Sequence, residues 1–109
     1  MYNGHMRPQE YKLSGKYNPV TVREKRLVKA LANLKSEKDA AALVRDMLTP
    51  AEIEEFANRL EVAVLLRKGK SYLEIAKKVG VSTTTVTRVA QWLFKGCGGY
   101  KNTLEKLGE

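Results

Sequence analysis

Serine and threonine residues recur just before segments with a 3.6-residue apolar period, and glycines recur where those segments end. Thr49-Pro50-Ala51-Glu52 has the pattern of a capping box with proline at the first helical position, where its missing N–H costs nothing. Ser71 with Glu74 repeats the capping-box pattern, and Ser82 precedes a further periodic segment. Three of the segments are followed by glycine, at Gly69, Gly80 and Gly96. These capping and terminating residues predict short helices and no strand, so the expected fold class is all-α.

Five such breaks divide residues 20–109 into six predicted helices. The helices are expected at about 21–34, after Ser36, at about 50–68, from Ser71 to Gly80, at about 83–95 and at about 100–107. Apolar residues at helical spacing form a stripe on the first two helices, namely Leu27, Val28, Leu31 and Leu34, then Ala40, Leu43, Val44 and Met47. On the third helix the residues expected to face a core are Ile53, Phe56, Ala57, Leu60 and Val64. Residues 1–19 show neither a helical nor a strand period, and we expect them to form a flexible basic arm.

The charge of the chain is concentrated in its C-terminal half. The 109 residues, a length typical of one domain, include 20 Lys and Arg against 12 Asp and Glu, a net charge of +8. Between residues 67 and 101, eight Lys and Arg face one acid, Glu74. Such a local excess is typical of a protein that meets a polyanion, and double-stranded DNA is the expected partner. Because no apolar run reaches membrane-spanning length, we expect no membrane association and a cytoplasmic location.

The side chains needed for catalysis or metal binding are scarce. Cys97 is the one cysteine and His5 the one histidine, so a single chain can form neither a disulfide nor a zinc site of the Cys/His type. No histidine in the predicted helical region can serve as the base of a hydrolytic or thiol mechanism. We therefore expect no catalytic residues, no metal and no enzyme.

Residues 72–95 have the pattern of a helix-turn-helix. Ala76 lies where two crossing helices would approach, and Gly80 lies in the turn, where a positive φ costs least without a Cβ. The apolar positions that would seal the two helices are Ile75, Val79, Val81, Val86 and Val89. The residues predicted to contact DNA are Lys70, Ser71, Lys77, Lys78, Ser82, Thr83, Thr84, Thr85, Thr87 and Arg88. An ordinary helical hairpin is the alternative, but threonines are poor helix formers and packing does not explain four of them among residues 83–87.

Two other functions are compatible with this pattern. The segment Gly69-Lys70-Ser71-Tyr72 with Glu74-Ile75-Ala76 also opens the recognition modules of transposases and recombinases, although the catalytic acids are missing. The second alternative is a helical module that binds another protein. The salt dependence of binding distinguishes a DNA-binding protein from a protein-binding module, because affinity for DNA falls steeply with salt and affinity for an apolar protein surface does not.

Several motifs together resemble the Trp repressor-like superfamily, and most closely its YerC/YecD-type branch. They are Leu48-Thr49-Pro50-Ala51-Glu52, Asn58-Arg59-Leu60-Glu61-Val62-Ala63, Gly69 to Ile75, Gly80 to Val89, and Gly99-Tyr100. The resemblance implies a six-helix subunit in an intertwined homodimer whose two helix-turn-helix heads enter successive major grooves. Such a dimer would be a transcription regulator, here a repressor, on a near-palindromic operator with half-sites about 34–36 Å apart.

The resemblance also implies where an effector would bind. Residues at the positions of the tryptophan pocket are Leu48, Thr49, Arg59, Arg88, Val89 and Trp92. The two arginines and the Leu-Thr pair match the family, whereas Val89 and Trp92 replace a small glycine and serine. Because their bulk fills the place of the indole, we expect no L-tryptophan co-repressor and a Trp92 that braces the recognition helix from within. For Arg59 an ion pair with Glu55 or Glu61 is the alternative, and Leu73 replaces a base-reading arginine, so the operator sequence is not inherited.

Overall fold

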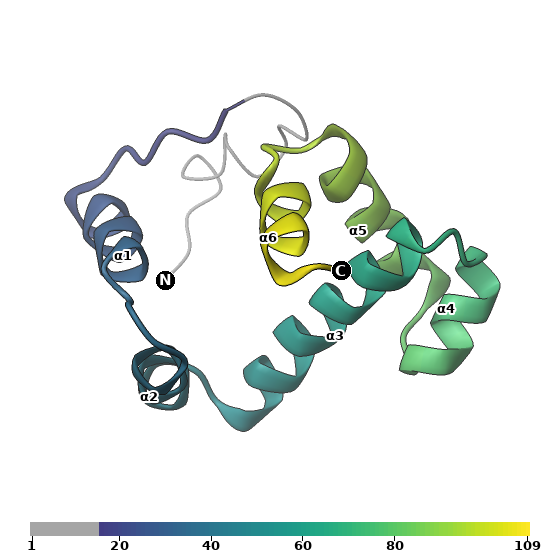
Figure 1. Cartoon of the computed structure of the whole chain (residues 1–109), viewed down its shortest axis with the longest axis horizontal. Helices are drawn as coiled ribbons and strands as arrows, with labels where there is room; N and C mark the ends of the chain where they lie inside the picture. The colour runs from purple at the N-terminus through teal and green to yellow at the C-terminus, as the bar shows by residue number, and fades with distance from the viewer. Residues whose placement is uncertain (1–15) are drawn as a thin grey trace. The chain divides into compact units, whose positions relative to one another are not determined.

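The computed structural model describes residues 16–109, which form six α-helices and no strand. In chain order they are α1 (Val22–Ala32), α2 (Glu37–Met47), α3 (Pro50–Arg67), α4 (Tyr72–Val79), α5 (Thr83–Lys95) and α6 (Gly99–Leu107) (Figure 1). The predicted all-α class and the six helices are confirmed. The first helix ends earlier than predicted, because the Asn33 side chain donates to the Lys29 carbonyl at 2.7 Å and closes the last turn. Of the predicted arm, residues 1–15 lie outside the described range, and residues 16–19 have no regular secondary structure.

The capping residues determine where the helices begin and end. Thr49 and Glu52 form a reciprocal capping box, in which the Thr49 hydroxyl accepts from the Glu52 N–H at 3.2 Å and the Glu52 carboxylate accepts from the Thr49 N–H at 2.9 Å. Ser71 caps α4 by accepting from the Glu74 N–H at 3.2 Å. Gly80 ends α4 with a φ of +82°, the left-handed conformation expected from its place in the turn.

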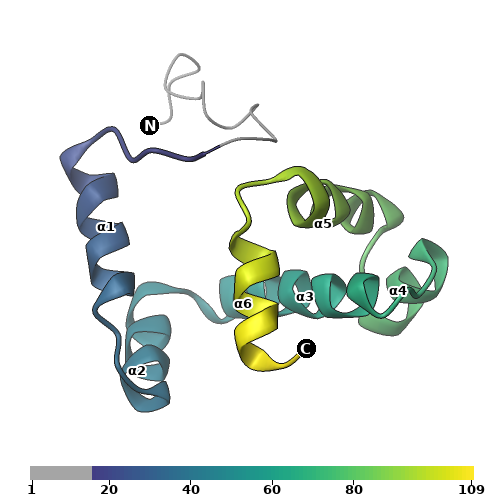
Figure 2. The same cartoon turned by 45° about the horizontal axis from the view of Figure 1, so that its top comes forward.

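The apolar core lies in the C-terminal unit of the chain, Ala57–Glu109. Its buried side chains come from four helices, and they are Val62, Ala63, Val64, Leu65, Leu66, Ile75, Ala76, Val86, Val89, Ala90, Leu93 and Leu104. Helix α5 contacts both α4 and α6, and Figure 2 shows it between them in the C-terminal unit. Helix α5 is therefore held from two sides.

The N-terminal unit, Asn18–Phe56, has no buried residue when the chain is taken alone. The predicted apolar stripe of α1 is present, but Leu27, Val28 and Leu31 are 42%, 42% and 53% exposed. Val44 and Met47 of α2 are likewise 41% and 52% exposed. A single chain therefore does not bury these stripes. An apolar face that is repeated on two helices and left open is available to a partner.

Gly96 separates α5 from α6 at a position where a side chain would collide with backbone. A Cβ on Gly96 would fall on the Trp92 carbonyl oxygen and lie 3.1 Å from the Trp92 carbonyl carbon. We expect Gly96→Ala to lower the free energy of unfolding by about 2–3 kcal/mol, the upper part of the range for overpacked sites. Gly80→Ala is the control, because its Cβ would meet nothing within 4 Å and the left-handed φ alone costs about 1 kcal/mol. Urea unfolding of both variants tests this, and equal losses would contradict the backbone contact.

Candidate nucleic-acid interface

The turn between α4 and α5 has the hydrogen bonds of a tight helix-turn-helix connection. The Gly80 N–H and the Val81 N–H both donate to the Ala76 carbonyl, at 2.9 and 3.1 Å. This closes α4 and brings the chain directly to Ser82, the N-cap of α5. On the inner side Ile75, Val86 and Val89 are fully buried, and Val79 and Val81 pack against them. The apolar positions predicted to seal the two helices therefore do so.

The hydroxyl groups at the start of α5 have different roles. Ser82 caps the helix by accepting from the Thr85 N–H at 3.1 Å, and its hydroxyl lies 3.1 Å from that of Thr85, which is half-buried. The Thr87 hydroxyl donates to the Thr83 carbonyl at 3.0 Å. The hydroxyls of Thr83 and Thr84 make no hydrogen bond within residues 16–109, and both residues are exposed. These two threonines are thus the ones with a hydroxyl free for an outside partner.

The N-terminus of α5 differs in charge from those of the four helices before it. Each of α1 to α4 carries at least one acid in its first turn, the usual complement of the positive end of the helix dipole. The first turn of α5 carries none, and neither does that of α6, which follows Gly98 and has no side-chain cap. The positive end of this helix, edged by Thr83 and Thr84, is left to attract an external anion.

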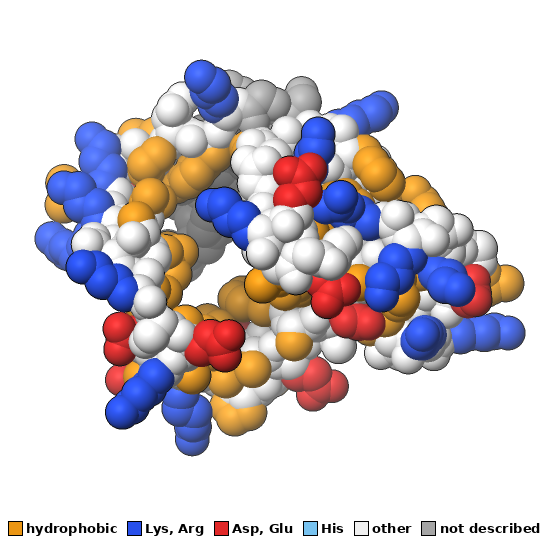
Figure 3. Space-filling view, in the orientation of Figure 1, with side chains coloured by type: hydrophobic (Ala, Val, Ile, Leu, Met, Phe, Trp, Pro, Cys, Tyr) orange, Lys and Arg blue, Asp and Glu red, His pale blue; other side chains and the backbone are white. Residues whose placement is uncertain are grey.

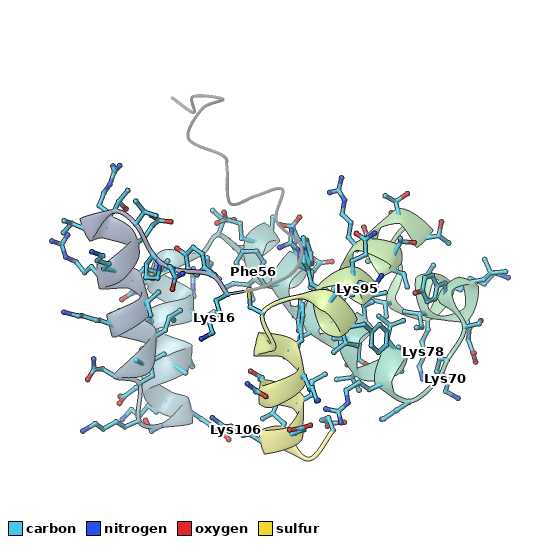
Figure 4. The ribbon with its side chains drawn as sticks, turned by 90° about the horizontal axis from the view of Figure 1, so that it is seen from above. Lys16, Phe56, Lys70, Lys78, Lys95 and Lys106 are labelled. Carbon is cyan, nitrogen blue, oxygen red and sulfur yellow. The ribbon has the colours of Figure 1, made fainter. Side chains whose placement is uncertain are left out.

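Exposed cations lie on or next to the same pair of helices, α4 and α5. Lys70, Lys77, Lys78 and Arg88 are all exposed, and Figure 3 shows Lys and Arg side chains gathered around α4. Figure 4 labels Lys70 and Lys78 in this part of the chain. Of the ten residues predicted to contact DNA, all lie on the head formed by residues 70–88, and all except Thr85 are exposed.

The residues predicted for an effector pocket lie in different surroundings. The Arg59 guanidinium carbon lies 5.7 Å from the centroid of the Trp92 ring, within the range of a cation–π contact. Trp92 is partly buried and packs against the core, whereas Val89 is within it and Arg88 is exposed. Leu48 and Thr49 belong to the N-terminal unit, where the Thr49 hydroxyl caps α3.

Tyr100 joins this cluster from α6. It packs against the core, and burial raises the pKa of its phenol while the nearby positive charge of Arg59 acts to lower it. Arg59 thus lies near two aromatic side chains from two other helices. The sequence identified Tyr100 only as part of the Gly99-Tyr100 motif.

An open groove of about 400 Å³ lies beside α5, and the sequence analysis did not predict it. Its lining residues are Tyr72, Thr87, Ala90, Gln91, Phe94 and Lys95. Thr87, Gln91 and Phe94 follow the i, i+4, i+7 spacing of one helix face, which was the available signal. Within residues 16–109 no group of three or more His, Cys, Asp or Glu is placed to hold a metal ion. No helix of the same range is long and apolar enough to cross a bilayer.

Comparison with known proteins identifies a family and a solved structure that match this chain. A family model described as Trp repressor protein matches residues 23–108. The uncharacterized protein YerC of Bacillus subtilis (strain 168) is 35% identical over 83 residues, which are 76% of this chain and 80% of YerC. The crystal structure of a TrpR like protein from Eubacterium eligens ATCC 27750 matches with a TM-score of 0.73 and 39% identity, covering 81% of this chain and 91% of that one.

Proposed function

The chain belongs to the Trp repressor family, and from this premise we propose that it is a sequence-specific DNA-binding transcription regulator that inserts α5 into the major groove. The similarity to YerC agrees with the branch indicated by the sequence motifs. The family is one of DNA-binding regulators rather than enzymes.

The observation that carries this proposal is the exposed, acid-free N-terminus of α5, where Thr83 and Thr84 have free hydroxyls. An acid in the first turn would stabilise α5, as it does the four preceding helices; α6 also lacks one, but its N-cap is Gly98, which carries no hydroxyl. A helix end that approaches phosphates and base edges must keep such a charge away. The free hydroxyls of Thr83 and Thr84 suit base or phosphate oxygens, and the threonine methyls suit the methyl group of thymine.

We propose further that the protein acts as a homodimer and represses by occupying its operator. The support is the open apolar face of α1 and α2, which a second copy would cover. Two heads related by a twofold axis read a near-palindromic site with half-sites about one helical turn apart. A protein bound there excludes polymerase without needing any further surface.

Selection of bound fragments from a random duplex pool tests the proposal. At about physiological salt we expect an enriched near-palindromic motif with half-site centres about 10 base pairs apart. The matched control is the Thr83→Ala/Thr84→Ala variant, which leaves the Ser82 cap in place and should lose the motif. Recovery without any enriched motif, by a chain shown to be folded, would refute sequence-specific reading.

The contact between Arg59 and Trp92 supports regulation without L-tryptophan. The Trp92 ring already lies against the Arg59 guanidinium, and Val89 is within the core beside it. Effectors that act by coupling change affinity about 5–150-fold, whereas we expect saturating L-tryptophan to leave the DNA affinity of this protein unchanged. Fluorescence anisotropy with labelled duplex, with and without the amino acid, measures this. A gain of about fivefold or more would show that the pocket is open after all.

A further inference from the structure

Helix α1 carries a cationic side that the helix-turn-helix does not use. Arg23, Lys25, Arg26 and Lys29 are all exposed. At 3.6 residues per turn, Lys25, Arg26 and Lys29 lie on the side opposite the apolar stripe, and Arg23 lies at the border between the two sides. Figure 3 shows Lys and Arg side chains gathered over α1, at the left of the view. The two sides of α1 therefore offer two different surfaces.

The charges on this side are not balanced by neighbouring acids. Arg23 and Arg26, Arg26 and Lys29, and Lys25 and Lys29 are three or four residues apart, the spacings at which like charges destabilise a helix. At those spacings none of the four cations has an acid. Within residues 16–109 none of them makes an ion pair.

Glu24, the single acid of α1, is held at the start of the helix. Its carboxylate accepts from the Val20 N–H at 3.1 Å and from the Thr21 N–H at 2.9 Å, completing the capping box. The cationic side is thus left with repulsions that an external polyanion would relieve.

We infer that the cationic side of α1 is a second DNA contact that binds phosphates independently of sequence. The inference rests on the proposed function, because DNA is the polyanion that the helix-turn-helix brings to the protein. Phosphate contact requires only cations, which this side supplies. An acidic protein would require an apolar core in its interface, and among the cations α1 offers only Val22 as a large apolar side chain.

The test compares two double variants with the same loss of charge in the same unit of the chain. Arg26→Gln/Lys29→Gln removes two cations from α1. Lys38→Gln/Arg45→Gln removes two from α2, which also carries Glu37, Asp39 and Asp46. All four substituted residues are exposed, so both variants should fold, which circular dichroism verifies. The affinity of the full chain for a labelled duplex of arbitrary sequence is measured between about 50 and 200 mM salt.

Each phosphate contact contributes about 0.9 to the slope of log affinity against log salt. We expect Arg26→Gln/Lys29→Gln to make the slope shallower by about 2 for each bound subunit, and Lys38→Gln/Arg45→Gln to leave it unchanged. Equal slopes for both variants would overturn the inference. Lys77→Gln/Lys78→Gln, in the head, should also lower the slope; if it does and the α1 variant does not, only the inference fails. If the wild-type chain itself shows no salt-dependent binding, the proposed function fails.

Discussion

Thr84→Glu should lower affinity for DNA about 100-fold while leaving the protein as stable as the wild type or slightly more stable. The new carboxylate would stand in the first turn of α5, where wild type has no acid. There it interacts favourably with the helix dipole, which stabilises the fold by about 0.3–1 kcal/mol. The same charge repels phosphates, and like charges in an interface cost several kcal/mol. A loss of about 2.8 kcal/mol corresponds to the expected 100-fold.

Thr84→Gln is the matched control, because glutamine has the length of glutamate without its charge. We expect this variant to lose far less affinity, and the difference between the two isolates the electrostatic part. Anisotropy titration gives the affinities, and thermal unfolding gives the stabilities. If Thr84→Glu lost stability and affinity together, or lost neither, the start of α5 would not be the DNA-facing end of the helix.

The helices of this protein are predictable because their ends have chemical markers. Thr49 with Glu52, and the glycines at 69 and 80, act within one turn, so their effect can be read from local sequence. The least accurate boundary is that of α1, where the end depends on an Asn33 side chain bending back to a carbonyl. Such a bond competes with other local bonds of asparagine and has no distinctive sequence pattern.

The exposure of the candidate DNA-contact residues was predictable from the sequence, but their hydrogen bonds were not. All of the ten except Thr85 are exposed, yet the sequence could not tell that Thr85 supports the Ser82 cap while Thr84 has a free hydroxyl. That division depends on side-chain rotamers and burial, which four threonines within five residues do not reveal. The groove beside Tyr72 and Phe94 was missed for a related reason, because it joins residues from two helices.

The apolar stripe of α1 was predictable, but the residues that cover it were not, for a physical reason. A periodic apolar stripe indicates that a helix face is to be buried, but it does not say whether the covering residues come from the same chain. The N-terminal unit has 39 residues, Asn18 to Phe56, and none of them is buried. So short a segment rarely buries enough surface to be stable by itself. The homodimer we propose resolves this, and it can be tested separately from DNA binding.

Leu31→Glu should convert the dimer to a monomer at micromolar concentration and lower the thermal midpoint. Leu31 lies in the middle of the α1 stripe and is 53% exposed in the single chain, and the partner in the proposed dimer would bury it. A charge placed in an apolar interface is left without a counter-ion, and such a change costs several kcal/mol, which weakens association by more than about 100-fold. Sedimentation velocity measures the mass across a dilution series.

Lys29→Glu provides the comparison, because it introduces the same acid on the opposite side of the same helix and should leave the dimer intact. A wild-type chain that sediments as a monomer at micromolar concentration would contradict the dimer directly. If the Leu31→Glu variant remained dimeric, the dimer interface would not include the apolar stripe of α1. If the midpoint of wild type rises with protein concentration and that of Leu31→Glu does not, folding of the N-terminal unit and association are one process. The open apolar face seen in a single chain is then the half of a core that the second chain completes.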